Sequence, residues 1–257
     1  MSRRLGRRLL AAVVSLAAFL IAWKLLTVVT DTPAYILPAP EVVGERALRA
    51  AGIGPGGTGI LWEHLWATVG EVILGFALGA STAVAVGTAL GKSVVIERVL
   101  SPYIVAAQAV PVLALAPLLD IWFGGGLLAR VLVCALIVFF PIAIATMVGI
   151  RSADPLLAEL FRSLGATPGQ LTARLEVPSA LPVLFGGLRV GVTLAVIGAV
   201  VAEWVSASVG LGVLINIADQ GLFDTPLMFV ALAALAIIGL AFYSLVVMVE
   251  RRLVKIA

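Results

Sequence analysis

Apolar residues fill several long stretches of the chain, and most charged residues lie in the segments between them. A helix that crosses the hydrocarbon core of a bilayer needs about 20 predominantly apolar residues. The stretches of about that length are 9–29, 64–90, 97–123, 127–150, 180–205 and 226–250. The pattern therefore predicts an all-α, polytopic membrane protein with about six transmembrane helices.

Composition supports the lipid bilayer as the surroundings of this chain. Apolar residues make up 62% of the 257 residues and charged residues 12%, with a mean hydropathy of +1.17. A soluble domain carries roughly a quarter charged residues. The basic residues form no cluster interleaved with aromatics, so a nucleic-acid partner is not expected. A lone histidine, His64, and a lone cysteine, Cys134, predict neither a metal site nor a disulfide.

The basic residues predict the orientation in the membrane. Twelve of them fall on one side: Arg3, Arg4, Arg7, Arg8, Lys92, Arg98, Arg151, Arg162, Arg174, Arg251, Arg252 and Lys255. Three fall on the other: Arg46, Arg49 and Arg130. Loops rich in Lys and Arg stay in the cytoplasm. Both termini and the 151–179 loop are therefore expected to be cytoplasmic, which requires an even number of spans.

The first apolar stretch has a second interpretation. Four arginines followed by an apolar run also resemble a cleaved signal peptide, and Ser2-Arg3-Arg4 resembles a twin-arginine signal. We favour an uncleaved first span because apolar residues resume at 25–29.

Small residues recur at every fourth position in two spans, where they allow helix backbones to approach closely. They are Gly75, Gly79, Ala83, Gly87 and Gly91 in the second span, and Gly187, Gly191, Ala195 and Ala199 in the fifth. Either stripe could pack within one subunit or line a subunit interface or pathway. Kinks are expected at Pro102, Pro111 and Pro117 of the third span and at Pro141 of the fourth.

Polar residues inside spans are costly and should face protein or water. Glu71 is one such residue. The candidates for a transport pathway are Gln108, Asp120, Arg189 and Glu203. Other interpretations are open: Asp120 and Glu203 could be hydrated carboxylates near the outer surface, and Arg189 could extend toward the inner one. Arg189 and Glu203 lie about 21 Å apart along one helix and cannot pair there.

The 151–179 loop has the sequence of two short amphipathic helices. Asp154-Pro155 begins the first, whose apolar residues recur at helical spacing. Gly165 ends it, and Thr167-Pro168 begins a second helix that reaches about Glu176. Such a pair could lie on lipid headgroups or dock into a groove of a soluble partner.

This loop resembles the E-A-A-x₃-G-x₉-I-x-L-P loop of importer permeases of the ATP-binding-cassette (ABC) class. Glu159 takes the first position, Gly165 the glycine, Leu175 the apolar position and Val177-Pro178 the final pair. Leu160 and Phe161 replace the two alanines, and valine replaces leucine. The resemblance extends from about Trp62 onward and includes PVLALAPLLDIWFG, RSLGAT, LPVLFGGLRVG, VIGAVVAEW and the GLG at 210–212, with LPAPEVV after the first span.

The resemblance implies a type I ABC importer permease fold over 1–257, in a bacterial plasma membrane. It implies a homodimer of permeases, two cytosolic ATPase subunits and an extracytoplasmic solute-binding protein. The residues that it assigns to ATPase coupling are Glu159, Phe161, Leu164, Gly165, Ala166, Thr167 and Pro178. The chain has no G-x-x-x-x-G-K-[ST] phosphate loop, so we expect no ATPase activity and no cofactor of its own.

The resemblance indicates only the branch of the permease family to which the solute belongs. The chain resembles permeases for sulfonates, taurine and nitrate and for thiamine-pyrimidine or riboflavin-type precursors. AAQAVPVLALAPLLDIWFG and LAVIGAVVAEW favour the vitamin-precursor branch. Asp120 stands where the family usually has an aliphatic residue, and a carboxylate there would oppose an anionic solute.

An ion-gradient-driven secondary transporter is the main alternative function. Such a protein would need carboxylates near the membrane midplane and usually an internal repeat. We find no repeat, and the carboxylates lie toward the outside. An intramembrane enzyme is disfavoured because no paired carboxylates share a depth and the one histidine lies at the end of a span.

Overall fold

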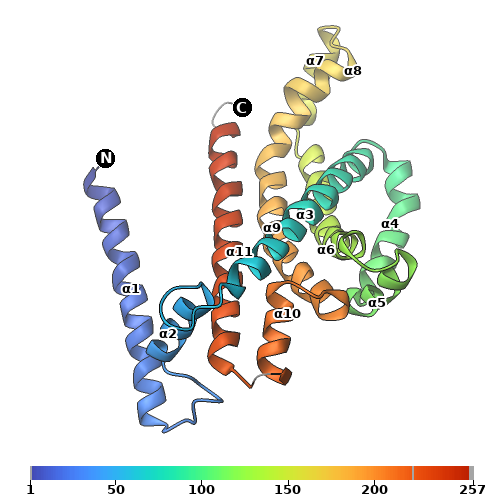
Figure 1. Cartoon of the computed structure of the whole chain (residues 1–257). Coiled ribbons are helices and arrows are strands. Elements are labelled where there is room, and N and C mark those ends of the chain that lie inside the picture. Colours follow the sequence, from blue (N-terminus) through green and yellow to red (C-terminus); the bar gives the residue numbers. More distant parts are fainter. Residues whose placement is uncertain (1, 222, 255–257) are drawn as a thin grey trace. The chain divides into compact units, whose positions relative to one another are not determined.

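The computed structural model describes residues 2–221 and 223–254, without the side chains of residues 2–9, 12 and 221. Arg3, Arg4, Arg7, Arg8 and Lys255, used above to predict orientation, therefore lie outside the described side chains. Every regular element in the described part is helical (Figure 1). The α-helices are α1 (Ser2–Val29), α2 (Pro40–Ala50), α3 (Ile60–Lys92), α4 (Val94–Ala109), α5 (Val112–Trp122), α6 (Leu127–Arg151), α7 (Pro155–Ser163), α8 (Pro168–Leu171), α9 (Val177–Ser206), α10 (Leu211–Asn216) and α11 (Thr225–Leu253). Two π-helical turns, η1 (Thr172–Glu176) and η2 (Ile217–Gly221), complete the order.

Four helical segments of the described chain are long and apolar enough to cross a membrane: Ile60–Lys92, Leu127–Arg151, Pro168–Ser206 and Thr225–Leu253. The predicted first span contributes a shorter apolar helix, Val13–Val29. The predicted third span is not one helix, because α4 and α5 meet at a bend of 95°. Counted as one broken span, this pair raises the number to five.

Pro111 explains the break in the third span. A proline has no amide hydrogen to donate and disfavours helical geometry in the residue before it. Val110 accordingly takes an extended conformation, with φ −78° and ψ 123°. Pro102, Pro117 and Pro141 remain inside α4, α5 and α6. The sequence predicted kinks, and at Pro111 the structure has a full break.

The second loop helix also differs from the prediction, because it does not end near Glu176. It continues through η1 into α9 without a break. In η1 the Val177 N–H bonds to the Thr172 carbonyl, five residues back. This wider turn leaves room for Pro178, whose ring would press on the preceding turn of a regular α-helix.

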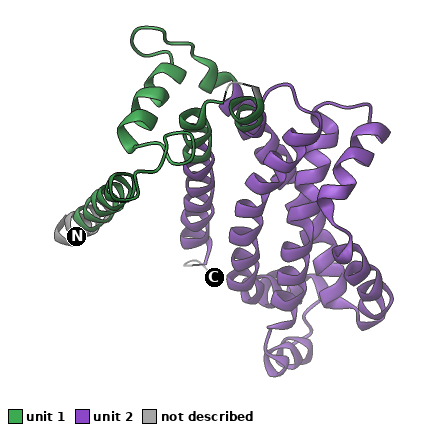
Figure 2. Cartoon of the chain, turned by 90° about the horizontal axis from the view of Figure 1, so that it is seen from below, with its two compact units in different colours: residues 1–63, 214–233 green, residues 64–213, 234–257 purple. Residues whose placement is uncertain are grey.

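The chain divides into two compact units, drawn in green and purple in Figure 2. Residues 64–213 and 234–257 form the larger unit, in which α6 packs between α3 and α9. A Cβ added at Gly75 would lie 2.2 Å from Cys134 Cβ, and one at Gly87 would lie 2.5 Å from the Ala143 carbonyl. On the α9 side, a Cβ at Gly187 would lie 2.4 Å from Ala145 Cβ. Both small-residue stripes therefore serve packing within the chain.

The smaller unit comprises residues 1–63 and 214–233. Here Arg46 of α2 donates to Asp224 at 2.6 Å, and the Trp23 ring stacks on Phe229 with centroids 5.5 Å apart. Lys24 bonds to Glu41, and this contact lowers the pKa of the Glu41 carboxyl. These contacts tie α1 and α2 to the start of α11.

Candidate functional site

Helix α7 is capped at both ends. The Asp154 carboxylate accepts the Leu156 N–H at 2.8 Å, and Pro155 occupies the first helical position. At the other end the Ala166 N–H bonds to the Phe161 carbonyl and the Gly165 N–H to the Arg162 carbonyl. These two bonds form a Schellman motif, which requires a left-handed residue. Gly165 supplies it, with φ +77°.

Helix α8 begins one residue after this motif. The Thr167 hydroxyl accepts the Gln170 N–H at 3.3 Å, and the Gln170 side chain accepts the Thr167 N–H at 2.8 Å. This reciprocal capping box, with Pro168 next to it, confirms the predicted helix start. The turn between α7 and α8 is thus hydrogen-bonded on both sides of Gly165.

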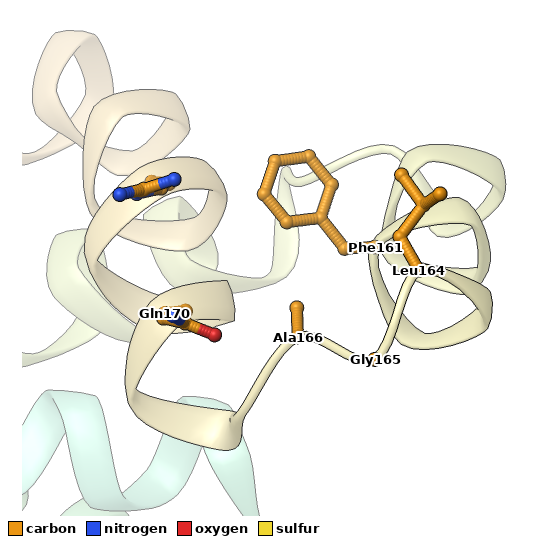
Figure 3. Close-up of a pocket in the computed structure, with 6 residues that line it drawn as sticks. Phe161, Leu164, Gly165, Ala166 and Gln170 are labelled. Atoms are coloured by element: carbon orange, nitrogen blue, oxygen red, sulfur yellow. The ribbon is translucent and has the colours of Figure 1, made fainter.

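The two helices form a knob that extends beyond the end of α9 (Figure 1). Phe161 points into the space between α7 and the following helix (Figure 3). A hollow of about 440 Å³ there is lined by Phe161, Leu164, Gly165, Ala166, Gln170 and Arg174. The predicted coupling residues Phe161 to Thr167 therefore lie together around one turn. Pro178 lies further along, in the first turn of α9.

The apolar face of α7 is open. Leu156 and Leu164 are 74% and 77% exposed, and Leu160 is 51% exposed. Glu159 is also exposed. Within the part of the chain that the structure describes, α7 has no buried residue. An amphipathic helix with its apolar face uncovered has the form of a docking element.

Glu203 lies in the most extensive buried polar network of the described residues. It is 1% exposed, so the interpretation as a hydrated carboxylate is wrong. Its two oxygens accept the Thr68 hydroxyl and the Gly212 N–H, each at 2.5 Å. The Thr68 hydroxyl also accepts the Leu211 N–H at 2.8 Å, and His64 Nδ1 lies 2.6 Å from the Gly210 carbonyl oxygen. The network joins α3 and α9 to the turn at residues 210–212.

Glu71 and Arg130 form a second buried contact, at 2.5 Å. Glu71 is 1% exposed, and its second oxygen has no hydrogen-bond partner in the described structure. From the sequence, Arg130 indicated only the orientation in the membrane. Nothing in the spacing of two residues on different spans could have predicted their pairing.

The remaining pathway candidates have separate environments. Arg189 forms an ion pair with Glu250 of α11. Asp120 is half-buried on α5, with one oxygen lacking a partner, and Gln108 is exposed in the last turn of α4. Across the described residues, no hydrogen bond or ion pair joins any two of Gln108, Asp120, Arg189 and Glu203. The structure does not bring these four residues into one site.

Two basic residues at the root of the knob were considered above only for their charge. Lys92, the last residue of α3, donates to Thr172 of η1 at 2.6 Å and lies 3.4 Å from the Glu176 carboxylate. Arg151, the last residue of α6, donates to the Leu90 carbonyl and to Glu97, at 2.8 and 2.7 Å. These contacts join α3, α4, α6 and η1.

A helical bundle with a capped, exposed helical knob before a long span is the arrangement expected from the resemblance to ABC importer permeases. The profile of the family described as "Binding-protein-dependent transport system inner membrane component" matches residues 75–255, and the chain belongs to this family. It is therefore a membrane-embedded permease subunit of an ABC transporter.

Individual relatives and a solved structure agree with this family assignment. The riboflavin transport system permease protein RibX of Chloroflexus aurantiacus is 47% identical over 242 residues, covering 94% of this chain and 88% of RibX. The formylaminopyrimidine transport permease protein ThiX of Halalkalibacterium halodurans is 34% identical, covering 90% of this chain and 89% of ThiX. A chain of the inward-facing MetNI methionine ABC transporter superimposes with a TM-score of 0.67 at 20% identity, covering 76% of this chain and 96% of that one. The last comparison shows the shared type I permease fold.

Proposed function

We propose that residues 1–257 form one permease domain that supplies half of a translocation pathway, and that the α7–Gly165–α8 knob docks into a cytosolic ATPase subunit. The observation that carries this proposal is the exposed apolar face of α7 next to a turn held by two capping motifs. Docking in a groove needs a helix of defined direction. A helix that only rests on headgroups needs no such rigid turn.

The complete transporter on this proposal holds two copies of this chain, two ATPase subunits and an extracytoplasmic solute-binding protein. The knob and both termini lie in the cytoplasm of a bacterial cell, in accord with the twelve basic residues on that side. Glu159 and Arg162, both exposed on α7, would meet charged groups at the rim of the ATPase groove.

For the solute we propose a vitamin or vitamin-precursor heterocycle of the riboflavin type. Support comes from the identity with RibX, which is higher than the 31% with the taurine permease TauC of Escherichia coli. The planar side chains Tyr103 and Trp122 are 71% and 67% exposed on α4 and α5, where they could stack on an aromatic ring.

The docking proposal is tested with the permease purified together with its ATPase. Phe161→Asp places a charge in the hollow between the helices, and Gly165→Val forces a β-branched residue into φ +77°. Both variants should insert at near-normal abundance but lose most ATP-driven uptake and retain little ATPase on purification. Ser163→Asp, an exposed change on the same helix, is the matched control. Normal transport with bound ATPase in both variants would support the membrane-surface role instead.

The solute proposal is tested separately in proteoliposomes that carry the binding protein. ATP-dependent uptake of labelled riboflavin should exceed that of labelled taurine. Uptake of taurine alone would place the chain in the anion branch.

A further inference from the structure

Helix α3 connects the knob to the opposite end of the larger unit. It is one uninterrupted helix of 33 residues, or roughly 48 Å. Near its start, Thr68 and His64 bond to the Glu203 network and the turn at residues 210–212. At its last residue, Lys92 contacts η1, which follows the knob directly. Helix α3 could therefore transmit a displacement of η1 to the turn at residues 210–212 as one rigid element.

The contact at Lys92 is built from three groups. The Lys92 ammonium donates to the Thr172 hydroxyl at 2.6 Å and lies 3.4 Å from Glu176, while Thr172 itself donates to Glu176 at 2.8 Å. Thr172 and Glu176 are four residues apart in the π-helical turn. π-Helical turns are rare and are found frequently at functional sites. The Lys92 side chain is 40% exposed and the Glu176 side chain 21% exposed, so the ion pair is partly buried from solvent.

Arg151 fixes the same helix end from the other side. Its guanidinium donates to the carbonyls of Leu90 and Gly91, at 2.8 and 3.2 Å, and to Glu97. Arg151 thus ties the end of α3 to α6 and α4, whereas Lys92 ties it to η1. Along its length α3 packs closely against α6 at Gly75, Gly79, Gly87 and Gly91.

We propose that Lys92 is a positioning residue for energy coupling, which transmits movement of the docked knob through Glu176 and Thr172 to α3. This proposal rests on the docking role of the knob proposed above. Without the Lys92 contact, the knob still binds the ATPase, but its movement is carried into the bundle less completely. ATP is then hydrolysed with less solute moved.

The test uses the full transporter reconstituted in proteoliposomes, with the ratio of ATP hydrolysed to solute transported as the main readout. Lys92→Ala and Glu176→Gln should each raise this ratio about fivefold or more, a typical size for coupling between sites. The ATPase should co-purify as it does with the unchanged chain. Lys92→Arg and the charge exchange Lys92→Glu/Glu176→Lys should restore the ratio at least in part. A merely structural role would lower the amount of assembled transporter and leave the ratio unchanged.

The outcomes separate the two proposals. An unchanged ratio in Lys92→Ala, or failure of the charge exchange to improve on its single variants, overturns the role of Lys92. Loss of the ATPase only in Lys92→Ala overturns it as well, because Lys92 would then act in docking. If Phe161→Asp leaves the ATPase bound and transport normal, the docking proposal fails instead.

Discussion

At residue scale, Glu203 explains the glycines of the GLG segment. A Cβ at Gly210 would lie 2.2 Å from the Glu203 carboxyl carbon, and one at Gly212 would lie 2.8 Å from its oxygen Oε2. Gly210 also has φ +153°. The carboxylate and the two glycines therefore form one unit, in which the absence of side chains lets the Gly212 N–H reach the buried carboxylate.

Replacing Glu203 should destabilise the protein in a graded way. Glu203→Gln keeps the shape but turns one acceptor into a donor, which should cost about 1–3 kcal/mol. Glu203→Ala removes both acceptors and leaves a cavity, so its loss should be larger. Thermal unfolding of the purified permease measures both, with the exposed change Glu63→Gln as control. Equal stability of all three variants would contradict the network.

The buried ion pair of Glu71 and Arg130 permits a double-mutant cycle. Arg130→Gln alone leaves Glu71 buried without its partner, an effect that in buried pairs typically costs about 3–5 kcal/mol. Glu71→Gln/Arg130→Gln removes both charges and should recover much of that loss. Additive losses in unfolding measurements would show that the two side chains do not interact.

At element scale, the contact between α3 and α6 depends on backbone proximity. A residue with a Cβ at position 87 would meet the Ala143 carbonyl at 2.5 Å and Thr146 Cβ at 2.6 Å. Gly70, on the same helix, has nothing within 4 Å of the Cβ position. The same Gly→Ala substitution at these two sites of α3 therefore separates the effect of packing on stability from the effect of helix propensity.

Gly70→Ala should stabilise the protein by roughly 0.5–1 kcal/mol, because alanine favours a helix interior more than glycine does. Gly87→Ala should destabilise it, by about 1–3 kcal/mol, because the added methyl group has no space. The sign of the change in unfolding temperature is the measurement. Stabilisation by both substitutions would contradict the close approach of α3 and α6.

At the scale of the whole molecule, the orientation prediction joins the sequence to the proposed partners. On a Cys134→Ala background, Ser163→Cys on α7 should not react with a membrane-impermeant thiol reagent in intact cells. Ala34→Cys, exposed in the loop after α1, should react. Labelling of Ser163→Cys alone would invert the topology and remove the ATPase from reach of the knob.

The sequence by itself determined the features that depend on neighbouring residues. Four of the six predicted spans are helices long enough to cross a membrane. The helix starts at Asp154-Pro155 and Thr167-Pro168 and the helix end at Gly165 were also predicted and confirmed, because helix starts and ends are set by local hydrogen bonds and backbone sterics. The family also followed from this loop, whose spacing lies within a few turns of helix.

Tertiary structure decided what depends on which helices become neighbours. Thr68 and Glu203 are 135 residues apart, and Lys92 and Thr172 are 80 apart. A periodic pattern shows that such groups need partners, but it does not say which helix supplies them. The 95° break before Pro111 and the continuous helix through Pro178 show the same limit. A proline removes one hydrogen bond in either place, and the packing around it decides between a break and a widened turn.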